Sequence, residues 1–133
     1  MKKVSLLFFG LVGLVCLIGC GSNVQLNGTV TYEDGSPVEF GNVVFATDKF
    51  QASGMIKSEG KYTMGSVDVS DGLPKGSYKV YIEGASEEVS GRGGTSMRSL
   101  IDPKFTTFAS TPLTCDIPAP KNTFDIKVPK NPK

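Results

Sequence analysis

The chain of 133 residues contains no histidine and no tryptophan, and only three cysteines. Histidine is the usual proton-transfer group near neutral pH and the commonest protein ligand for transition metals. Without it, a serine nucleophile has no imidazole to activate it, and an iron-dependent site lacks its usual ligands. A lysine could replace the base in principle, so a hydrolase is disfavoured rather than impossible. We expect a non-catalytic protein with no cofactor and no metal site.

The chain also lacks an excess of either charge. It carries 14 basic and 13 acidic residues, and removal of Lys2 and Lys3 with a leader would leave a balance of 12 − 13 = −1. A near-neutral chain without a basic patch offers no electrostatic attraction for a polyphosphate backbone. We therefore expect no nucleic-acid partner.

Residues 1–19 have the three parts of a secretory signal. Lys2 and Lys3 form the basic start, and residues 4–18 are an uncharged, mostly apolar run of 15 residues. A bilayer-spanning helix needs about 20 residues, and the segment after residue 20 carries no charges that would stop transfer. An uncleaved membrane anchor remains the alternative. We expect residues 1–19 to be removed as a signal peptide.

The end of this run, Leu17-Ile18-Gly19-Cys20, resembles the lipobox of bacterial lipoproteins. In that family the thiol receives a diacylglycerol, the leader is cut just before the cysteine, and the new N-terminus is acylated. The resemblance implies that Cys20 is the lipid attachment site and that residues 20–23 form a lipidated tether. Two or more acyl chains hold a protein firmly on a bilayer. The implied location is the cell envelope, and Gly21 in place of Asp favours the outer membrane.

Only one cysteine remains for the folded part. Cys16 leaves with the leader and Cys20 is used for lipid, so Cys115 has no partner for an internal disulfide. It alternates with Leu113 and Ile117, which places it on the core face of a strand. There a cysteine behaves as a small apolar side chain.

Glycine is abundant, with 16 residues, and no apolar stripe of helical period runs for long after Cys20. This pattern indicates β-structure with many turns. Residues 24–32 alternate as in a half-buried strand, and residues 42–47 are apolar enough to be covered on both faces. A weaker strand is predicted at residues 52–57, and a further one at residues 61–64, where Tyr62 and Met64 share a face.

Turn residues separate these strands. Asp34-Gly35 supplies residues that tolerate positive φ between the first two strands, and Ser58-Glu59-Gly60 predicts a tight turn before residue 61.

The clearest strand covers residues 77–83, and we expect it to be the central one. Tyr78, Val80 and Ile82 share one face and should lie in the core. The opposite face is expected to be wet and carries Lys79, Tyr81 and Glu83. Residues 113–117 and 124–128 alternate on either side of a proline-rich turn and predict a closing hairpin. The seven short strands predict a sandwich.

Two polar segments have no apolar period. Residues 85–99 predict a long mobile loop, and such loops on a rigid scaffold often carry the binding surface. Its Gly91-Arg92-Gly93-Gly94 run echoes an RGG element, but a single copy outside a basic context carries little weight. The segment Asp68-Val69-Ser70-Asp71-Gly72 offers oxygen ligands for Ca²⁺, yet it lacks the bidentate Glu of an EF-hand, so a solvated turn is favoured.

Four motifs in order resemble the carboxypeptidase regulatory-like domains: the residue 24–32 strand, Asp34-Gly35-x-Pro37-Val38, the 58–63 turn, and Gly72-Leu73-Pro74-x-Gly76-x-Tyr78-x-Val80. The resemblance implies an all-β fold, a seven-stranded Ig-like or prealbumin-like (transthyretin-like) β-sandwich, after a cleaved signal peptide. The domain would cover residues 24–129, and residues 130–133 would be a C-terminal tail.

The sequence therefore predicts a lipid-anchored, non-catalytic lipoprotein of the cell envelope that acts as a binding or structural module. Its expected partners are membrane lipid, through acylated Cys20, and an envelope protein or glycan. The alternative is a carbohydrate-binding accessory domain at the cell surface. Sugar platforms usually expose aromatic rings, and here most Tyr and Phe residues alternate onto buried faces.

Overall fold

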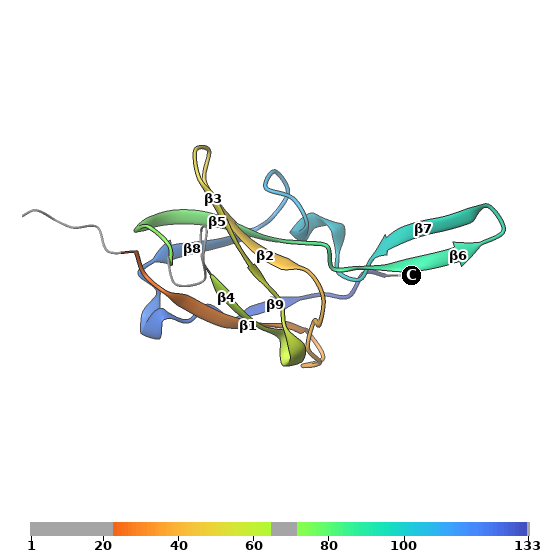
Figure 1. Ribbon diagram of the computed structural model, residues 1–133, viewed down its shortest axis with the longest axis horizontal. Helices are drawn as coiled ribbons and strands as arrows, with labels where there is room; N and C mark the ends of the chain where they lie inside the picture. Colours follow the sequence, from red (N-terminus) through yellow and green to blue (C-terminus); the bar gives the residue numbers. More distant parts are fainter. Residues whose placement is uncertain (1–22, 65–71, 133) are drawn as a thin grey trace, which may run out of the picture.

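The computed structural model describes residues 23–64 and 72–132, which form a β-sandwich with one projecting hairpin (Figure 1). One layer has the strand order β4-β1-β9 and the other has the order β3-β2-β5-β8. The seven sandwich strands are β1 (Leu26–Tyr32), β2 (Asn42–Ala46), β3 (Gln51–Met55), β4 (Lys61–Met64), β5 (Gly76–Glu83), β8 (Leu113–Ile117) and β9 (Ile126–Val128). The predicted all-β, seven-stranded sandwich is confirmed. Among the described residues, no helix is long and apolar enough to cross a membrane.

The core lies between the two sheets and is built by the expected alternation. Leu26 and Val30 of β1 are fully buried, as are Phe45 of β2 and Val80 of β5. The ring of Phe45 packs edge-on against that of Phe124, with 5.9 Å between centroids. Each fully buried side chain of this size contributes about 1.5–3 kcal/mol by leaving water.

Strand β5 lies between β2 and β8, as the sequence predicts for a central strand. Tyr78, Val80 and Ile82 all face the core. The Tyr78 hydroxyl donates a hydrogen bond to the Pro74 carbonyl at 2.6 Å, which ties the strand to the segment that precedes it.

The other face of β5 corrects the sequence prediction. Glu83 is exposed as expected, but Tyr81 is buried and Lys79 is half-buried. Tyr81 packs with Val44, Ala46 and Phe108 in a second, smaller apolar cluster. The expected wet face is wrong for Tyr81 because an irregular loop folds back and covers this part of the sheet with Phe108.

The predicted closing hairpin is also wrong. Strand β8 pairs antiparallel with β5, whereas β9 runs parallel to β1 in the opposite sheet. The connection between them, which contains the 3-10 turn Pro120–Asn122, crosses from one layer to the other. Two alternating strands have the same sequence pattern whether they pair in a hairpin or face each other across a core.

Both predicted turns are present. At Asp34-Gly35 the Ser36 amide donates to the Asp34 carboxylate at 2.9 Å, and Gly35 has φ +87°. The 3-10 turn Ser58–Gly60 leads into β4. Gly60 has φ +74°, and a Cβ there would lie 2.3 Å from the Val30 carbonyl oxygen. A side chain at Gly60 would therefore collide with β1, and the positive φ adds backbone strain.

The predicted mobile loop at residues 85–99 is instead a β-hairpin. Strand β6 (Ser86–Gly91) pairs antiparallel with β7 (Gly94–Ser99), and Arg92 and Gly93 form the turn. Most of its side chains are exposed on both faces. A strand pair that buries neither face needs no apolar alternation, so the sequence carried no period to reveal it.

Candidate functional site

The predicted attachment residues Leu17, Ile18, Gly19 and Cys20 lie outside the described residues, as does most of the calcium candidate at residues 68–72. The described chain is anchored soon after them. The Val24 amide donates to the Leu73 carbonyl and the Leu73 amide to the Val24 carbonyl, both at 2.8 Å. Leu73 is fully buried. The fold therefore holds the chain from Val24 onward, with residues 21–23 between that point and Cys20.

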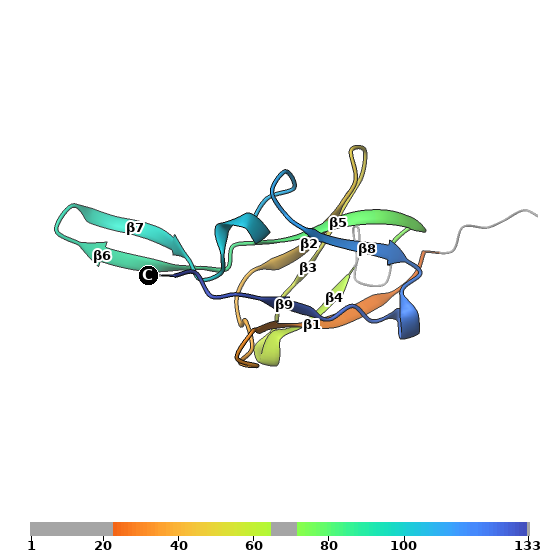
Figure 2. The same ribbon diagram turned by 180° about the vertical axis from the view of Figure 1, so that it is seen from behind.

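The sandwich has two distinct ends. The described chain enters at one end of the long axis, and the β6–β7 hairpin projects from the other (Figures 1 and 2). At the hairpin root the Leu100 amide donates to the Ala85 carbonyl at 2.8 Å, and Ala85 is buried. The Asn131 side chain donates to the Ser99 carbonyl at 2.9 Å. The C-terminal segment thus helps to fix the base of the hairpin.

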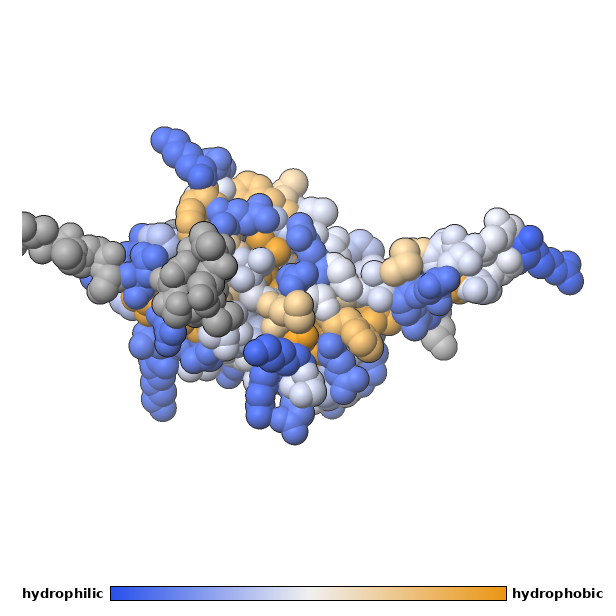
Figure 3. All heavy atoms as spheres, viewed as in Figure 1, coloured by the Kyte–Doolittle hydropathy of each residue, from blue (hydrophilic) through white to orange (hydrophobic). Residues whose placement is uncertain are grey.

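The hairpin surface is mainly polar, and Figure 3 shows it mostly in white and blue. Arg98 of β7 pairs with Glu87 of β6 across the strands, at a position where both side chains are about half exposed. Such a pair contributes little to stability because water screens it. The pair follows from the strand register, which places Glu87 directly opposite Arg98.

Exposed large apolar side chains lie on the hairpin and at its root. Among the described residues, the large apolar side chains that are exposed are Phe40, Met55, Val89 and Met97. Val89 and Met97 are on the hairpin itself. Phe40 and Met55, which are 60% and 68% exposed, line a hollow of about 420 Å³ together with Gly84 and Ser86 at the hairpin root. We call the side chains of Phe40, Met55, Val89 and Met97 the hairpin-end patch.

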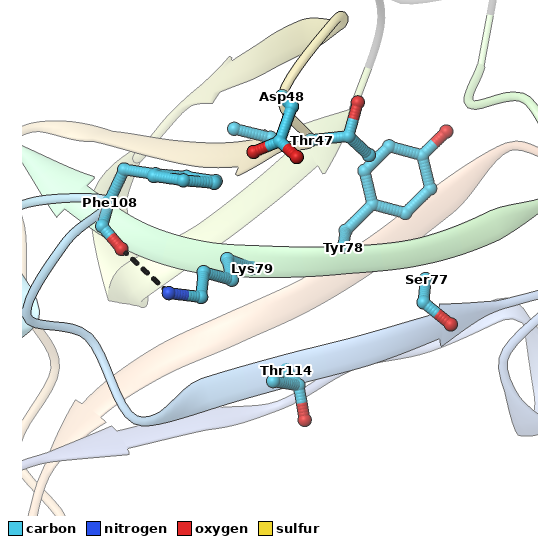
Figure 4. A pocket seen from close by; sticks show the side chains of 8 residues that line it. Thr47, Asp48, Ser77, Tyr78, Lys79, Phe108 and Thr114 are labelled. Carbon is cyan, nitrogen blue, oxygen red and sulfur yellow. Dashed lines mark hydrogen bonds between the residues drawn. The ribbon is translucent and has the colours of Figure 1, made fainter.

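A second hollow lies on the outer face of the four-stranded sheet (Figure 4). Ala46, Lys79 and Thr114 are neighbours in register across β2, β5 and β8 and form its floor. The Thr47-Asp48 turn and Phe108 from the covering loop form its walls, and its volume is about 260 Å³. We call it the outer-face hollow.

Lys79 is held in place at the edge of this hollow. Its ammonium donates to the Phe108 carbonyl at 3.3 Å and lies 4.8 Å from the centroid of the Phe108 ring. A cation at this distance is attracted to the face of an aromatic ring. Within residues 23–64 and 72–132, no carboxylate lies within ion-pair distance of Lys79. The ammonium therefore keeps donor capacity toward the hollow.

Cys115 lies in the core with 6% of its surface exposed, as predicted. Burial, followed by the nearby charge of Asp116, raises the pKa of the Cys115 thiol to about 11. A thiol that is neutral and buried is a poor nucleophile. Cys115 is thus a packing residue in this structure.

Among the described residues, no group of three or more cysteines, aspartates or glutamates is arranged to hold a metal ion. Sequence reasoning missed the outer-face hollow, because Phe108 comes from an irregular segment whose contact with Lys79 no local pattern predicts. It also missed the exposed Phe40 and Met55, which look like core residues by type alone.

No protein-family model matches the sequence, and no curated protein matches it. Among solved structures the chain is similar to the major pilin subunit of Bacillus cereus, with a TM-score of 0.48 and 11% sequence identity. That match covers 84% of this chain and 30% of the pilin chain. Similarity at this level defines neither a family nor a function. The β-sandwich fold is established by the structure, and the resemblance to carboxypeptidase regulatory-like domains beyond that fold stays a prediction.

Proposed function

We propose that the protein is a lipid-anchored, non-catalytic binding module of the cell envelope, held by acylated Cys20 and presenting its hairpin end to a partner protein. The outer membrane is the proposed location, from the residues around Cys20. The envelope is the setting in which a signal-like leader and a lipobox-like sequence would place a sandwich of this kind.

The observation that carries the proposal is that the chain entry and the hairpin lie at opposite ends of the fold. The described chain enters the sandwich at one end, and the β6–β7 hairpin, with the patch residues on it and at its root, projects from the other. The four residue steps from Cys20 to Val24 can span at most about 14 Å. An anchor at Cys20 would hold the Val24 end close to the bilayer and direct the hairpin away from it.

The hairpin-end patch supports a binding role. Exposed apolar side chains that share one surface mark contact sites more often than isolated ones do, and Phe40 and Met55 lie side by side in this way. Phe40 and Met55 share one hollow, and Val89 and Met97 lie on opposite faces of the adjoining hairpin. A partner that gripped the hairpin from both sides would cover all four.

Fractionation of cells that express a Cys20→Ser variant tests the anchor. We expect the wild-type chain in the membrane fraction, and the variant either soluble or retained with its leader uncleaved. Cys16→Ser is the matched control, since it removes a thiol from the same leader outside the lipobox and should leave localisation unchanged. A Cys20→Ser chain of normal mature mass in the membrane fraction would overturn the proposal.

A further inference from the structure

We propose that the outer-face hollow binds one neutral sugar unit of a glycan. This site lies on the sheet face and uses none of the hairpin-end patch, so the inference is independent of the proposed function. Pockets for drug-sized ligands have volumes of about 300–1,000 Å³. The outer-face hollow, at about 260 Å³, is slightly smaller and suits a single ring.

The charges around the hollow match a ligand that both donates and accepts hydrogen bonds. Lys79 presents an ammonium with three donors, one of which goes to the Phe108 carbonyl. Asp48 is exposed, lines the same hollow from the Thr47-Asp48 turn (Figure 4), and presents a carboxylate, which only accepts. The exposed Thr114 hydroxyl on the floor can do both.

A neutral polyol fits this pair of charges better than an ion does. One positive and one negative group line the outer-face hollow. An anion attracted by Lys79 is therefore repelled by Asp48, and a cation attracted by Asp48 is repelled by Lys79. The hydroxyls of a sugar can donate to Asp48 and accept from Lys79 at the same time. Hydrogen bonds to charged groups are the stronger kind, which gives a small neutral ligand a reason to bind.

The remaining walls are apolar and fixed in advance. The Phe108 ring packs against Val44, Ala46 and Tyr81, and Lys79 lies over the ring as well. The Thr47 hydroxyl accepts from the Phe50 amide at 3.0 Å, which holds the turn that carries Asp48. A sugar ring presents apolar C–H groups beside its hydroxyls, and a preformed wall lowers the entropic cost of binding them.

The test uses the full chain in a sugar-free detergent and saturation-transfer NMR with glucose, galactose and N-acetylglucosamine as probes. Saturation should pass from the protein to at least one probe. Asp48→Asn and Lys79→Met should each weaken binding of that probe by about tenfold, because each removes a charged hydrogen-bonding group. Lys79→Met keeps the aliphatic stem over Phe108.

Lys127→Met is the matched control, since Lys127 is exposed on β9 of the other sheet. It should leave the affinity unchanged, as should replacement of residues 87–98 by a short Gly-Ser link. Absence of transfer to all three sugars would overturn the proposal, and so would equal affinity of the Asp48→Asn and wild-type chains. Asp48 is exposed, so Asp48→Asn decides the question even if Lys79→Met fails to fold.

Discussion

Gly28 of β1 occupies a position where a side chain has no room. A Cβ at Gly28 would lie 2.0 Å from the Phe124 carbonyl oxygen and 2.7 Å from the Tyr62 hydroxyl oxygen. The Tyr62 hydroxyl donates to that same carbonyl, and the Phe124 amide donates to the Asn27 carbonyl at 3.0 Å. These contacts join β4, β1 and the segment leading into β9 through one point.

Gly28→Ala should therefore lower the free energy of unfolding by about 1–3 kcal/mol, the usual cost of adding a methyl group to a filled space. Urea denaturation measures the change. Gly91→Ala is the control, because no atom lies within 4 Å of a Cβ built on Gly91. Equal stability of the two variants would show that the segment around Phe124 yields without cost.

Cys115 should react slowly with thiol reagents in the native state. Its pKa is raised from 9.0 to about 11 by burial and by Asp116, so the reactive thiolate at about pH 8 is about a hundredfold scarcer than for an ordinary thiol. The measurement is the labelling rate before and after addition of denaturant.

The same shift links stability to alkaline pH. Between about pH 9 and the folded value of about 11, the unfolded chain loses its thiol proton while the folded chain keeps it. The contribution of Cys115 is therefore complete below this range and is lost as pH rises through it. In the labelling experiment, rapid reaction of the native protein, or a disulfide-linked dimer, would contradict the buried placement of Cys115.

At the residue scale, alternation was enough to place Cys115 and Val80 in the core, because one buried face fixes every second side chain of a strand. It was not enough for Tyr81. The burial of Tyr81 depends on Phe108, which arrives from an irregular loop after a separate hairpin. The outer-face hollow depends on the same loop, so it was beyond the reach of the sequence for the same reason.

The hairpin is the element that most changes the interpretation of the sequence. Pairing of Gly91 with Gly94 leaves only Arg92 and Gly93 outside the ladder. We expect limited trypsin digestion to cut first after Arg92, because proteases act on exposed turns that can adapt to their active sites. Arg98 lies within β7 and pairs with Glu87, so cleavage there should be slower.

Mass spectrometry of a digestion time course checks this order. Arg92→Gln should delay the first cut without changing the unfolding transition, because Arg92 is exposed and lies in the turn. A first cut at Lys49, in the turn between β2 and β3, would contradict the prediction that the hairpin tip is the most accessible site.

At the scale of elements, the sequence predicted the existence of the sandwich strands well and their partners less well. Strands β1, β2 and β5 carry clear alternation or continuous apolar runs, and each lies close to its predicted range. Strands β8 and β9 were found as strands but assigned to one hairpin. The partner of a strand depends on the route of the connecting chain, here through Pro120–Asn122, and that route has no periodic signature.

The whole molecule has a direction that no single element shows. The Val24 end is held by the paired backbone of Val24 and Leu73, and the opposite end carries the hairpin. The C-terminal segment runs to the hairpin root. There the backbone of Lys130 pairs with that of Ile101 in an isolated antiparallel β-bridge, and the Lys130 ammonium donates a hydrogen bond to the Asp34 carboxylate at 2.6 Å. The N-terminal segment of the described chain is therefore fixed at one end of the fold, and the C-terminal segment at the other.

The arrangement of the two ends determines what an anchor at Cys20 would do. If Cys20 is acylated, the membrane and the hairpin-end patch lie at opposite ends of the sandwich, and the patch can meet a partner. If Cys20 is not acylated, nothing in the fold distinguishes one pole as the attached one. The proposed function therefore depends on the chemical state of Cys20.

The most direct measurement is tandem mass spectrometry of the N-terminal tryptic peptide of the protein isolated from membranes. We expect a peptide that begins at Cys20, ends at Lys49, and carries a diacylglyceryl thioether on the sulfur and an acyl group on the amine. A peptide that retains residues of the 1–19 leader, or one that begins elsewhere or has a free Cys20 thiol, would contradict the lipid anchor.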